Sequence, residues 1–234
     1  GAFAVTEANA GSDVSSMKTR AVKRNGDWHL SGQKVFITNG GIADVHVVVA
    51  AVDPELGTRG QASFVIGKGA RGLTQGKKEK KMGIRASHTA EVLLDDVVVP
   101  SDQLLGGEEK LEAKLARARS GEHGRSSVAL KTFETTRPVV GAQALGIARA
   151  AFEFARDYAK ERIAFGKPII ENQAIAFKLA DMAMAIEAAR MLVGRALWLG
   201  RNCGEVEIRA GGQGQLRARA GGGRGSLGHH PCRP

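Results

Sequence analysis

The sequence contains little cysteine, few aromatic residues and no long apolar run. Two cysteines, Cys203 and Cys232, are too few for a disulfide framework, which indicates a reducing compartment. Aromatic residues make up 5% of the chain, and no basic–aromatic interleaving marks a surface for stacking nucleic-acid bases. No apolar run approaches the ~20 residues that span a bilayer. These absences exclude a disulfide-rich secreted domain and argue against nucleic-acid and membrane partners.

What is present is the composition of a globular protein with one large or two modest domains. Part of the net charge of +10 comes from a basic run from Lys68 to Arg85, in which Glu79 is the one acidic residue. Such a run is typical of a solvated loop or strand edge and, less often, of a phosphate-facing patch. The chain starts at Gly1 inside an apolar run, with no signal peptide visible, so we expect its natural N-terminus to lie upstream.

Residues 1–106 carry a β pattern. Asn25-Gly26 is a strong hairpin signal between predicted strands at 18–23 and 27–30. Further strands are predicted at 2–5, 33–38, 45–52, 62–66 and 91–99. The charged segment 107–131 has a short helical rhythm at Leu111 and Leu115 that fades into serine and glycine, and we interpret it as a linker or insertion.

From residue 132 to 203 the apolar period becomes helical. We predict a helix capped by Thr135 or Thr136, with Pro138 in its first turn, that runs to about Tyr158. After a break around Gly166, a longer helix is predicted from about residue 172. One apolar face of this helix should pack against helices of this chain or of another. That face contains Ile175, Leu179, Met182, Ile186, Ala189 and Val193.

Residues 204–234 are rich in glycine and arginine, contain no Lys or Asp and keep no periodicity. Composition therefore predicts a disordered tail. One hypothesis is that the tail is out-of-frame translation of a GC-rich gene, because suitable codons for residues 212–215 read Ala-Lys-Ala after a shift of one base. The DNA sequence tests this hypothesis: the alternative frame should encode an amphipathic helix ending in a Gly-Gly motif.

The most informative segment is the polar turn at residues 6–13, which follows the first apolar run. Thr6 and Ser12 supply hydroxyl groups beside backbone amides, and Gly11 lets the backbone approach a ligand closely. This combination suits a flat heteroaromatic ring or a phosphate. The alternative is an ordinary polar turn after a strand.

Four segments, in order, resemble the acyl-CoA dehydrogenases. They are Val5-Thr6-Glu7 through Gly11-Ser12-Asp13; Gly32 through Val35-Phe36-Ile37-Thr38-Asn39; Lys81-Met82-Gly83-Ile84-Arg85-Ala86-Ser87 with Asp96 to Pro100; and Thr132-Phe133-Glu134-Thr135-Thr136-Arg137-Pro138, continuing through Glu161-Arg162 and Phe165-Gly166-Lys167 to Ala183. They cover roughly residues 1–203. The Thr-Arg-Pro motif most resembles the medium-chain branch of the family and its bacterial relatives.

The resemblance implies an α+β fold. A middle antiparallel β-barrel domain (1–106) would precede part of a C-terminal helical bundle (132–203), with the charged segment 107–131 between them and the tail 204–234 after them. The family's N-terminal helical domain and the end of its C-terminal domain would lie outside this chain.

The resemblance also implies FAD-dependent α,β-dehydrogenation of acyl-CoA thioesters, as in fatty-acid β-oxidation. A carboxylate removes the α-proton, the β-hydrogen leaves as hydride to the flavin, and electron-transferring flavoprotein reoxidises the cofactor. Such a site must stabilise a developing enolate and exclude water. The implied assembly is a homotetramer without metal, cytoplasmic in a bacterium and in the mitochondrial matrix of a eukaryote.

Flavin contacts are carried over from the family by position. Those at the ring are Phe3, Val5, Thr6, Gly11, Ser12, Phe36, Ile37 and Thr38. Those at the pyrophosphate and adenosine, reached from a neighbouring subunit, are Arg162, Phe165 and Gln173. Phe36 stands where the family usually has tryptophan, so an aromatic face is kept and the indole N–H is lost. The alternatives are plain strand core for Phe36 and Ile37, and a helix-end cation for Arg162.

Substrate contacts are carried over to Ser12, Glu134, Thr135, Thr136 and Arg137, although Arg137 could instead be a surface cation at a helix start. No catalytic base is predicted. The family's glutamate lies either beyond the end of this chain or directly before the arginine matched by Arg137, where this chain has Thr136. Impaired or absent activity is therefore expected. Two alternatives stay open: a non-catalytic subunit that binds acyl-CoA or FAD, and an acyl-CoA oxidase.

Overall fold

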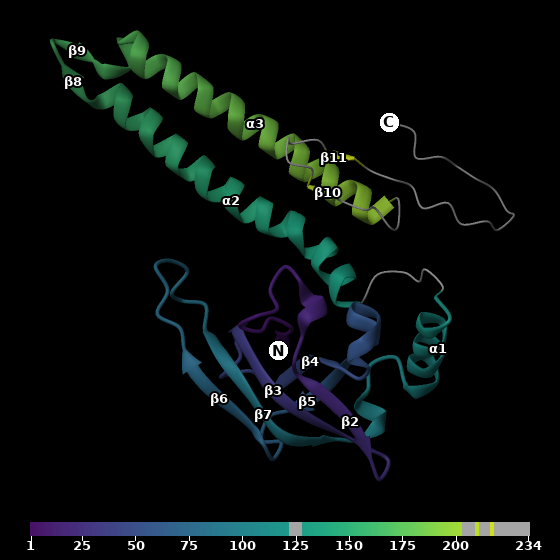
Figure 1. Ribbon diagram of the computed structural model, residues 1–234. Coiled ribbons are helices and arrows are strands. Elements are labelled where there is room, and N and C mark those ends of the chain that lie inside the picture. Colours follow the sequence, from purple (N-terminus) through teal and green to yellow (C-terminus); the bar gives the residue numbers. More distant parts are fainter. Residues whose placement is uncertain (122–127, 203–208, 211–215, 218–234) are drawn as a thin grey trace, which may run out of the picture. The chain divides into compact units, whose positions relative to one another are not determined.

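The computed structural model describes residues 1–121, 128–202, 209–210 and 216–217 (Figure 1). The chain divides into two compact units, Gly1–Lys131 and Thr132–Pro234. The first unit is built on a β-sheet and the second on two long helices.

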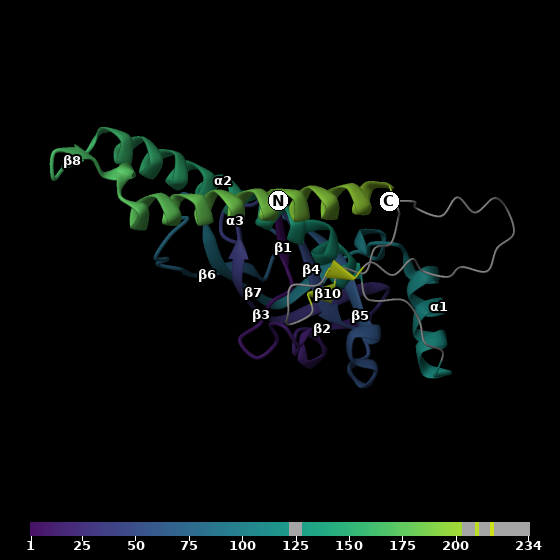
Figure 2. The ribbon, with the colours of Figure 1, turned by 90° about the horizontal axis from the view of Figure 1, so that it is seen from above.

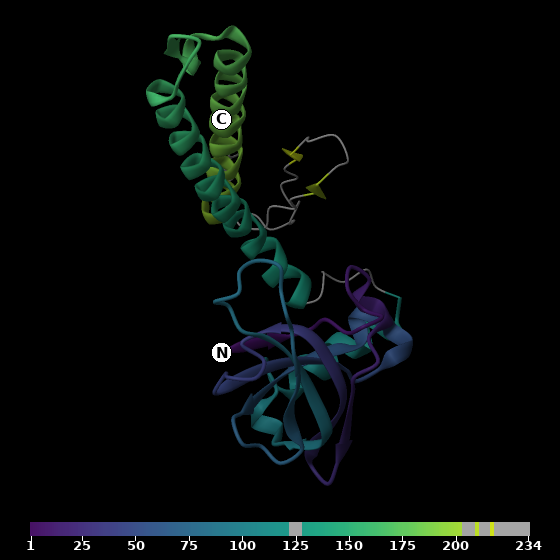
Figure 3. The ribbon, with the colours of Figure 1, turned by 90° about the vertical axis from the view of Figure 1, so that its left-hand side faces the viewer.

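The first unit contains one seven-stranded sheet that curls around its core (Figure 3). Its strands are β1 (Ala2–Ala4), β2 (Arg20–Arg24), β3 (Asp27–Thr38), β4 (Val45–Ala51), β5 (Gln61–Gly67), β6 (Leu73–Lys78) and β7 (Thr89–Val99). The order is β1-β4-β2-β3-β7-β6, and β5 also pairs with β4. The predicted middle β domain is confirmed.

The prediction that this sheet is antiparallel throughout is wrong. Strand β1 runs parallel to β4 over its whole length, and β2 pairs with β4 in parallel at one residue. The other pairings are antiparallel. Parallel neighbours require a long crossover, and here the chain between β1 and β4 forms the whole β2–β3 hairpin before it returns. This connection brings the N-terminal strand and the turn that follows it into the sheet domain.

The core of the sheet domain is formed by the inward side chains of the alternating strands. Leu30, Phe64 and Val97 are fully buried, and the rings of Trp28 and Phe64 lie 5.4 Å apart between centroids in a tilted arrangement. Tilted pairs of this kind are favoured by the aromatic quadrupole. The core therefore lies at the centre of the curl.

Residues 108–119, expected to belong to a charged linker or insertion, form helix α1 (Glu108–Arg119). Its Leu111 is buried in the sheet-domain core, and Leu115 packs against the same cluster. Ion pairs at 2.7 Å from Lys23 to Glu108 and at 2.8 Å from Arg119 to Asp53 connect the helix with the sheet domain. The apolar positions at 111, 115 and 118 were enough to form a buried stripe although charge dominates the segment.

The short 3₁₀ helices lie in the connections. They are η1 (Val14–Ser16), η2 (Pro54–Gly60), η3 (Ser101–Gln103) and η4 (Ile169–Glu171). The basic run forms edge strand β6 and the loop after it, in agreement with the predicted loop or strand edge. Exposed lysines on such an edge also discourage pairing with another sheet.

The second unit is a helical hairpin of α2 (Val128–Glu161) and α3 (Gln173–Asn202), which run side by side (Figures 1 and 2). Helix α2 begins earlier than the predicted Thr135 or Thr136, and Pro138 lies inside it. Proline removes one backbone donor there without ending the helix. Helix α3 starts as predicted, because the Asn172 carbonyl accepts the amides of Ile175 and Ala176 at 2.9 and 3.0 Å.

The predicted apolar face of α3 is its better-covered side. Five of the residues expected there are half-buried, and Met182 is exposed. A Cβ on Gly141 of α2 would lie 3.2 Å from Val193, so the two helices are in close contact. Many large apolar side chains of this unit are nevertheless exposed: Val139, Val140, Ile147, Phe154, Tyr158, Phe177, Met184, Met191, Leu192 and Trp198.

Strands β8 (Ile163–Ala164) and β9 (Lys167–Pro168) connect α2 to α3. Within the predicted tail, β10 (Arg209–Ala210) pairs with β11 (Leu216–Arg217). The other residues of that tail lie outside the described part of the chain. Where the structure describes the chain, none of its helices combines the length and the apolar character needed to cross a membrane.

Gly32→Ala should lower the free energy of unfolding by about 2 kcal/mol, because it overpacks the β2–β3 region. Gly32 has φ +152°, and a Cβ there would meet the Oγ1 and Cα atoms of Thr19 at 2.5 and 2.7 Å. Thr19 cannot easily move, since its carbonyl accepts the Ala51 amide at 2.9 Å. Denaturant unfolding measures the change. Gly67→Ala, with no atom within 4 Å, is the matched control and should change stability by less than about 0.5 kcal/mol. Equal losses in both variants would contradict the steric argument.

Candidate functional site

The polar turn after β1 is closed by its own backbone and fastened to β3. Glu7 and Ala10 exchange two backbone hydrogen bonds, both of 3.1 Å. The Val35 amide of β3 donates to the Thr6 carbonyl at 2.9 Å. The Glu7 carboxylate points inward, where it accepts the backbone amides of Lys18 at 2.7 Å and Thr19 at 3.0 Å. Three separate segments of the chain therefore meet at the turn.

Lys34 lies at the centre of this junction, with its side chain 0% exposed. Its Nζ donates to the Val5 carbonyl at 3.0 Å and to the Glu7 carboxylate at 2.9 Å. Burial lowers the pKa of Lys34 to about 8, against the opposing effect of Glu7. Burial alone would raise the pKa of Glu7, but hydrogen bonds from Thr19, Lys34 and the Lys18 amide outweigh it and leave that pKa below its ordinary value. The pair is thus ionic at neutral pH.

The free energy of unfolding should rise as the pH increases from about 8 toward 10.5. The folded pKa of Lys34 is about 8 and its ordinary value is 10.5, so in this window the unfolded chain binds more protons than the folded one. Stability increases with pH wherever that difference is positive. Denaturant unfolding of the wild type and Lys34→Met at several pH values checks this expectation. The rise should be weaker in the variant, and equal slopes would contradict the lowered pKa.

A β-bulge turns one aromatic side chain of β3 outward. The β3–β7 register shifts between Lys34 and Ile37, and within this interval Phe36 has φ +59°. Its side chain is 63% exposed, whereas Val35 and Ile37 on either side are buried. A bulky residue at positive φ is strained, and such strain occurs preferentially at functional sites. Phe36 is therefore not strand core, while Ile37 is.

The predicted ring-binding residues of the sheet domain fall into two groups. Thr6 and Phe3 are half-buried, Ser12 and Thr38 are exposed, and a Cβ on Gly11 would have no atom within 4 Å. The side chains of Val5 and Ile37 are 2% and 3% exposed, so that only their backbone could face a ligand. The hydrogen bonds at Val5, Thr6 and Val35 bring the first part of the turn beside the bulge.

The end of the polar turn is organised by Asp13. Its carboxylate accepts the Ser15 amide at 3.0 Å, the Ser16 hydroxyl at 2.6 Å and the Ser15 hydroxyl. These bonds cap η1, and they lower the pKa of Asp13. Ser12 therefore precedes a locally ordered turn.

The predicted FAD-binding residues of the second unit gather at one end of the helical hairpin, at β8 and β9 (Figure 1). The Arg162 carbonyl accepts the Ile169 amide at 2.9 Å across the connection, and Gln173 opens α3. Phe165 has φ +54° and is 99% exposed at the tip, next to Gly166 at φ +77°. All three predicted side chains are exposed.

The predicted substrate residues of the second unit lie on α2. Thr136 and Arg137 are exposed, and the Thr136 hydroxyl donates to the Thr132 carbonyl at 3.1 Å. The side chains of Glu134 and Thr135 lie outside the described part of the structure. These residues and the ring-binding group thus belong to different compact units.

Sequence reasoning missed the buried pair of Lys34 and Glu7, although both residues lie in the motifs that carried the resemblance. The available signal was a lysine directly before the run Val35-Phe36-Ile37 in a strand with few other charges. Lysine is almost never fully buried unless it is paired. A lysine at that position therefore predicts an acidic partner in the core.

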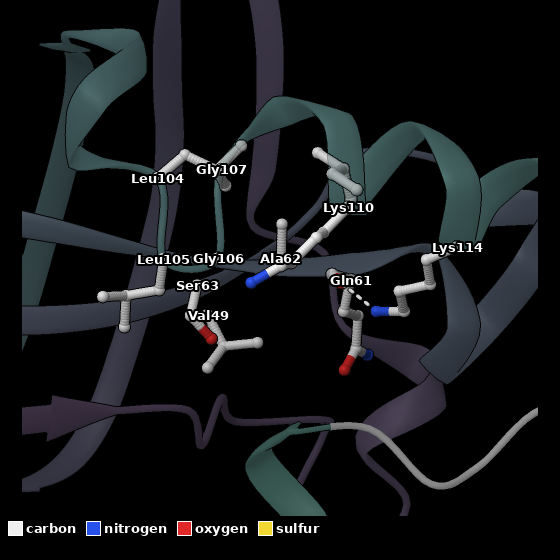
Figure 4. A pocket seen from close by; sticks show the side chains of 11 residues that line it. Val49, Gln61, Ala62, Ser63, Leu104, Leu105, Gly106, Gly107, Lys110 and Lys114 are labelled. Atoms are coloured by element: carbon white, nitrogen blue, oxygen red, sulfur yellow. Dashed lines mark hydrogen bonds between the residues drawn. The ribbon is translucent and has the colours of Figure 1, made fainter.

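The sheet domain also has a pocket of about 370 Å³ between β4, β5 and the start of α1 (Figure 4). Leu104, Leu105 and Leu111 contribute much of its apolar lining. Lys114 donates to the Gln61 carbonyl at 2.6 Å, and burial lowers the pKa of this lysine. None of the predicted flavin or substrate residues lines this pocket. The candidate site is therefore the surface formed by the turn and the bulge, and not this pocket.

Comparisons with known proteins agree with the two-unit organisation. The family model described as "Acyl-CoA dehydrogenase, middle domain" matches residues 2–97, and "Acyl-CoA dehydrogenase, C-terminal domain" matches residues 126–212. An acyl-CoA dehydrogenase of Bacillus subtilis is 46% identical over 208 residues, which are 88% of this chain and 51% of the relative. The chain spans about half the length of the curated relatives it matches.

Two solved structures show the same likeness. Butyryl-CoA dehydrogenase from Megasphaera elsdenii matches with a TM-score of 0.72 and 44% identity, over 86% of this chain and 49% of that one. A chain in the structure "Electron transferring flavoprotein of Acidaminococcus fermentans" matches with a TM-score of 0.71 and 42% identity, over 85% and 49%.

Proposed function

The chain belongs to the acyl-CoA dehydrogenase family, and on this premise we propose that it supplies the flavin and substrate walls of an FAD-dependent enzyme that dehydrogenates acyl-CoA thioesters at the α and β carbons. One observation supports this most strongly. The polar turn is hydrogen-bonded to β3 directly beside the bulge that turns Phe36 outward. The polar edge at Thr6 therefore lies next to the exposed aromatic face of Phe36.

The residues at this wall fit a flat heteroaromatic ring. Phe36 offers an aromatic face that the core does not use, and aromatic faces stack favourably on other rings. The hydroxyls of Thr6 and Thr38 can donate or accept hydrogen bonds, and the space beside Gly11 is open. In the proposed complex Phe36 and the backbone of Ile37 would cover the flavin, Thr38 would bond near N5, and Thr6 would meet the pyrimidine edge.

The remaining cofactor and substrate contacts come from the second unit and from Ser12. Arg162, Phe165 and Gln173 would bind the pyrophosphate and adenosine of an FAD in a neighbouring subunit, where the guanidinium fork suits phosphate oxygens. Arg137, with Ser12, Glu134 and Thr135, would contact the acyl-CoA. The exposed side chains of Arg162 and Phe165 are compatible with this role.

The chemistry divides between cofactor and protein. FAD, when bound, accepts the β-hydrogen as hydride. The protein must remove the α-proton with a carboxylate and shield the site from water. Position 136 carries a hydroxyl where one branch of the family has its glutamate, so impaired or absent turnover is proposed for this chain. Thr136 also favours a second candidate, a non-catalytic subunit that binds FAD or acyl-CoA.

The proposed partners follow from the family. Electron-transferring flavoprotein would reoxidise the cofactor, and one similar solved structure carries that name. A homotetramer would cover apolar side chains such as Phe154 and Trp198 of the helical hairpin. The relatives of bacterial origin favour a cytoplasmic protein.

Phe36→Gly should separate flavin binding from stability. The exposed ring contributes little to the core, and glycine relieves the strained φ while it adds freedom to the unfolded chain, so the free energy of unfolding should change by less than about 1 kcal/mol. Loss of the stacking face should weaken FAD binding about tenfold. Fluorescence titration with FAD and denaturant unfolding measure the two effects. Val22→Thr, a change of similar volume at an exposed position of β2, should change neither, and unchanged FAD affinity in Phe36→Gly would contradict the proposed wall.

A further inference from the structure

We propose that the buried pair of Lys34 and Glu7 is a positioning device that sets the Thr6 edge against the Phe36 face of the proposed flavin wall. This inference rests on the proposed function. Neither residue is accessible enough to contact a ligand itself, because both side chains are buried. They act through Thr6 and Phe36, and they are therefore positioning residues.

The pair holds the backbone on both sides of Thr6. Lys34 Nζ binds the Val5 carbonyl directly before Thr6, and the Glu7 carboxylate directly after it. The Thr6 carbonyl itself is bound by the amide of Val35. Thr6 is thus fastened at its own backbone and at both chain neighbours, all by residues 34 and 35. The backbone that carries the Thr6 side chain is therefore held against β3 on both sides.

Lys34 lies at the edge of the bulge in β3. Ladder pairing with β7 is continuous from Gly32 to Lys34, shifts, and resumes at Ile37, so Lys34 is the last paired residue before the bulge. A strained φ such as that of Phe36 persists only where the surroundings over-determine it. The buried pair fixes the strand at the bulge's first boundary, and the ladder with Ala90 fixes it at the second.

A buried ion pair is a poor means of stabilising the fold alone. Buried ion pairs lose much of their attraction to desolvation, and well-packed apolar residues often replace them without loss. The lowered pKa of Lys34 shows that burial does disfavour its charge here. What an apolar pair would not supply is the directed hydrogen bonds to Val5, Lys18 and Thr19. Positional specificity is the property that these bonds add.

The test compares the wild type with Lys34→Met and with the milder Glu7→Gln. Hydrogen exchange of the chain without FAD reports whether the segments 5–10 and 34–37 loosen, and fluorescence titration gives the FAD dissociation constant. Phe64→Leu, a core substitution in β5 that leaves both members of the pair in place, controls for lost stability. Lys23→Met, which breaks the exposed pair with Glu108, controls for the loss of one lysine. Lys34→Arg keeps the positive charge, so its loss of exchange protection and of FAD affinity should be smaller than that of Lys34→Met.

The expected result is that Lys34→Met loses exchange protection in both segments and raises the FAD dissociation constant about tenfold. Glu7→Gln should do the same to a smaller extent. Phe64→Leu and Lys23→Met should change the dissociation constant less than about twofold. Unchanged protection of the two segments, or an equal effect of Phe64→Leu, would overturn the positioning role. If the wild type binds no FAD, the proposed function itself fails. Loss of exchange protection in Lys34→Met would then show that the pair of Lys34 and Glu7 is only structural, and this result would also overturn the inference.

Discussion

Lys34→Met should lower the free energy of unfolding by about 3 kcal/mol, because it breaks a buried ion pair by removing one partner. Methionine fills most of the volume of the lysine stem. It leaves the Val5 carbonyl without its donor and the Glu7 carboxylate buried without its counter-charge. Unfolding followed by tryptophan fluorescence in a Trp198→Phe background measures the effect, because Trp28 in the sheet-domain core then reports on that unit alone.

Two further variants show whether the unpaired Glu7 carboxylate causes the loss of stability in Lys34→Met. Adding Glu7→Gln to Lys34→Met removes the uncompensated carboxylate, so the double variant should be more stable than Lys34→Met alone. Lys23→Met breaks the exposed ion pair with Glu108 and should cost much less, because exposed ion pairs contribute little to stability. If Lys34→Met costs no more than Lys23→Met, the buried pair has no special role in the fold.

Thr136→Glu should raise the rate at which an acyl-CoA reduces the bound flavin by about a hundredfold. A positioned general base contributes on the order of 10²–10⁴ in rate, and we propose that residue 136 corresponds to the glutamate of one branch of the family. The substitution is structurally mild, since Thr136 is exposed on α2 and glutamate is a good helix former. Anaerobic mixing of the FAD-loaded chain with butyryl-CoA, followed by flavin absorbance, gives the rate.

Thr136→Gln is the matched control for this gain. It has nearly the same size and helix propensity as the glutamate variant but no carboxylate, so its rate should stay at the wild-type level. Equal rates in the two variants would contradict the role assigned to position 136.

The strand pattern could be predicted because apolar alternation and turn residues are local signals. Asn25-Gly26 does connect β2 and β3, and the helical period after residue 132 does correspond to α2 and α3. The resemblance to the family came from four short motifs in order, and the family comparisons confirm it. These strands, helices and motifs can be predicted without knowledge of long-range contacts.

Other features depend on contacts between distant segments. The parallel pairing of β1 with β4 follows from the path of the chain, not from the composition of either strand. The outward turn of Phe36 depends on a bulge opposite β7, and neighbouring Ile37 has a similar sequence signal but a buried side chain. Helix α1 was misinterpreted because its charges outweighed the stripe containing Leu111.

The most direct test of the central claim is the visible absorption spectrum of the purified chain after incubation with FAD and removal of the free cofactor. We predict that flavin absorbance stays with the protein, and that butyryl-CoA does not bleach it because position 136 lacks a carboxylate. Protein that emerges with no flavin absorbance would contradict the proposal that the polar turn and the Phe36 bulge form a flavin wall.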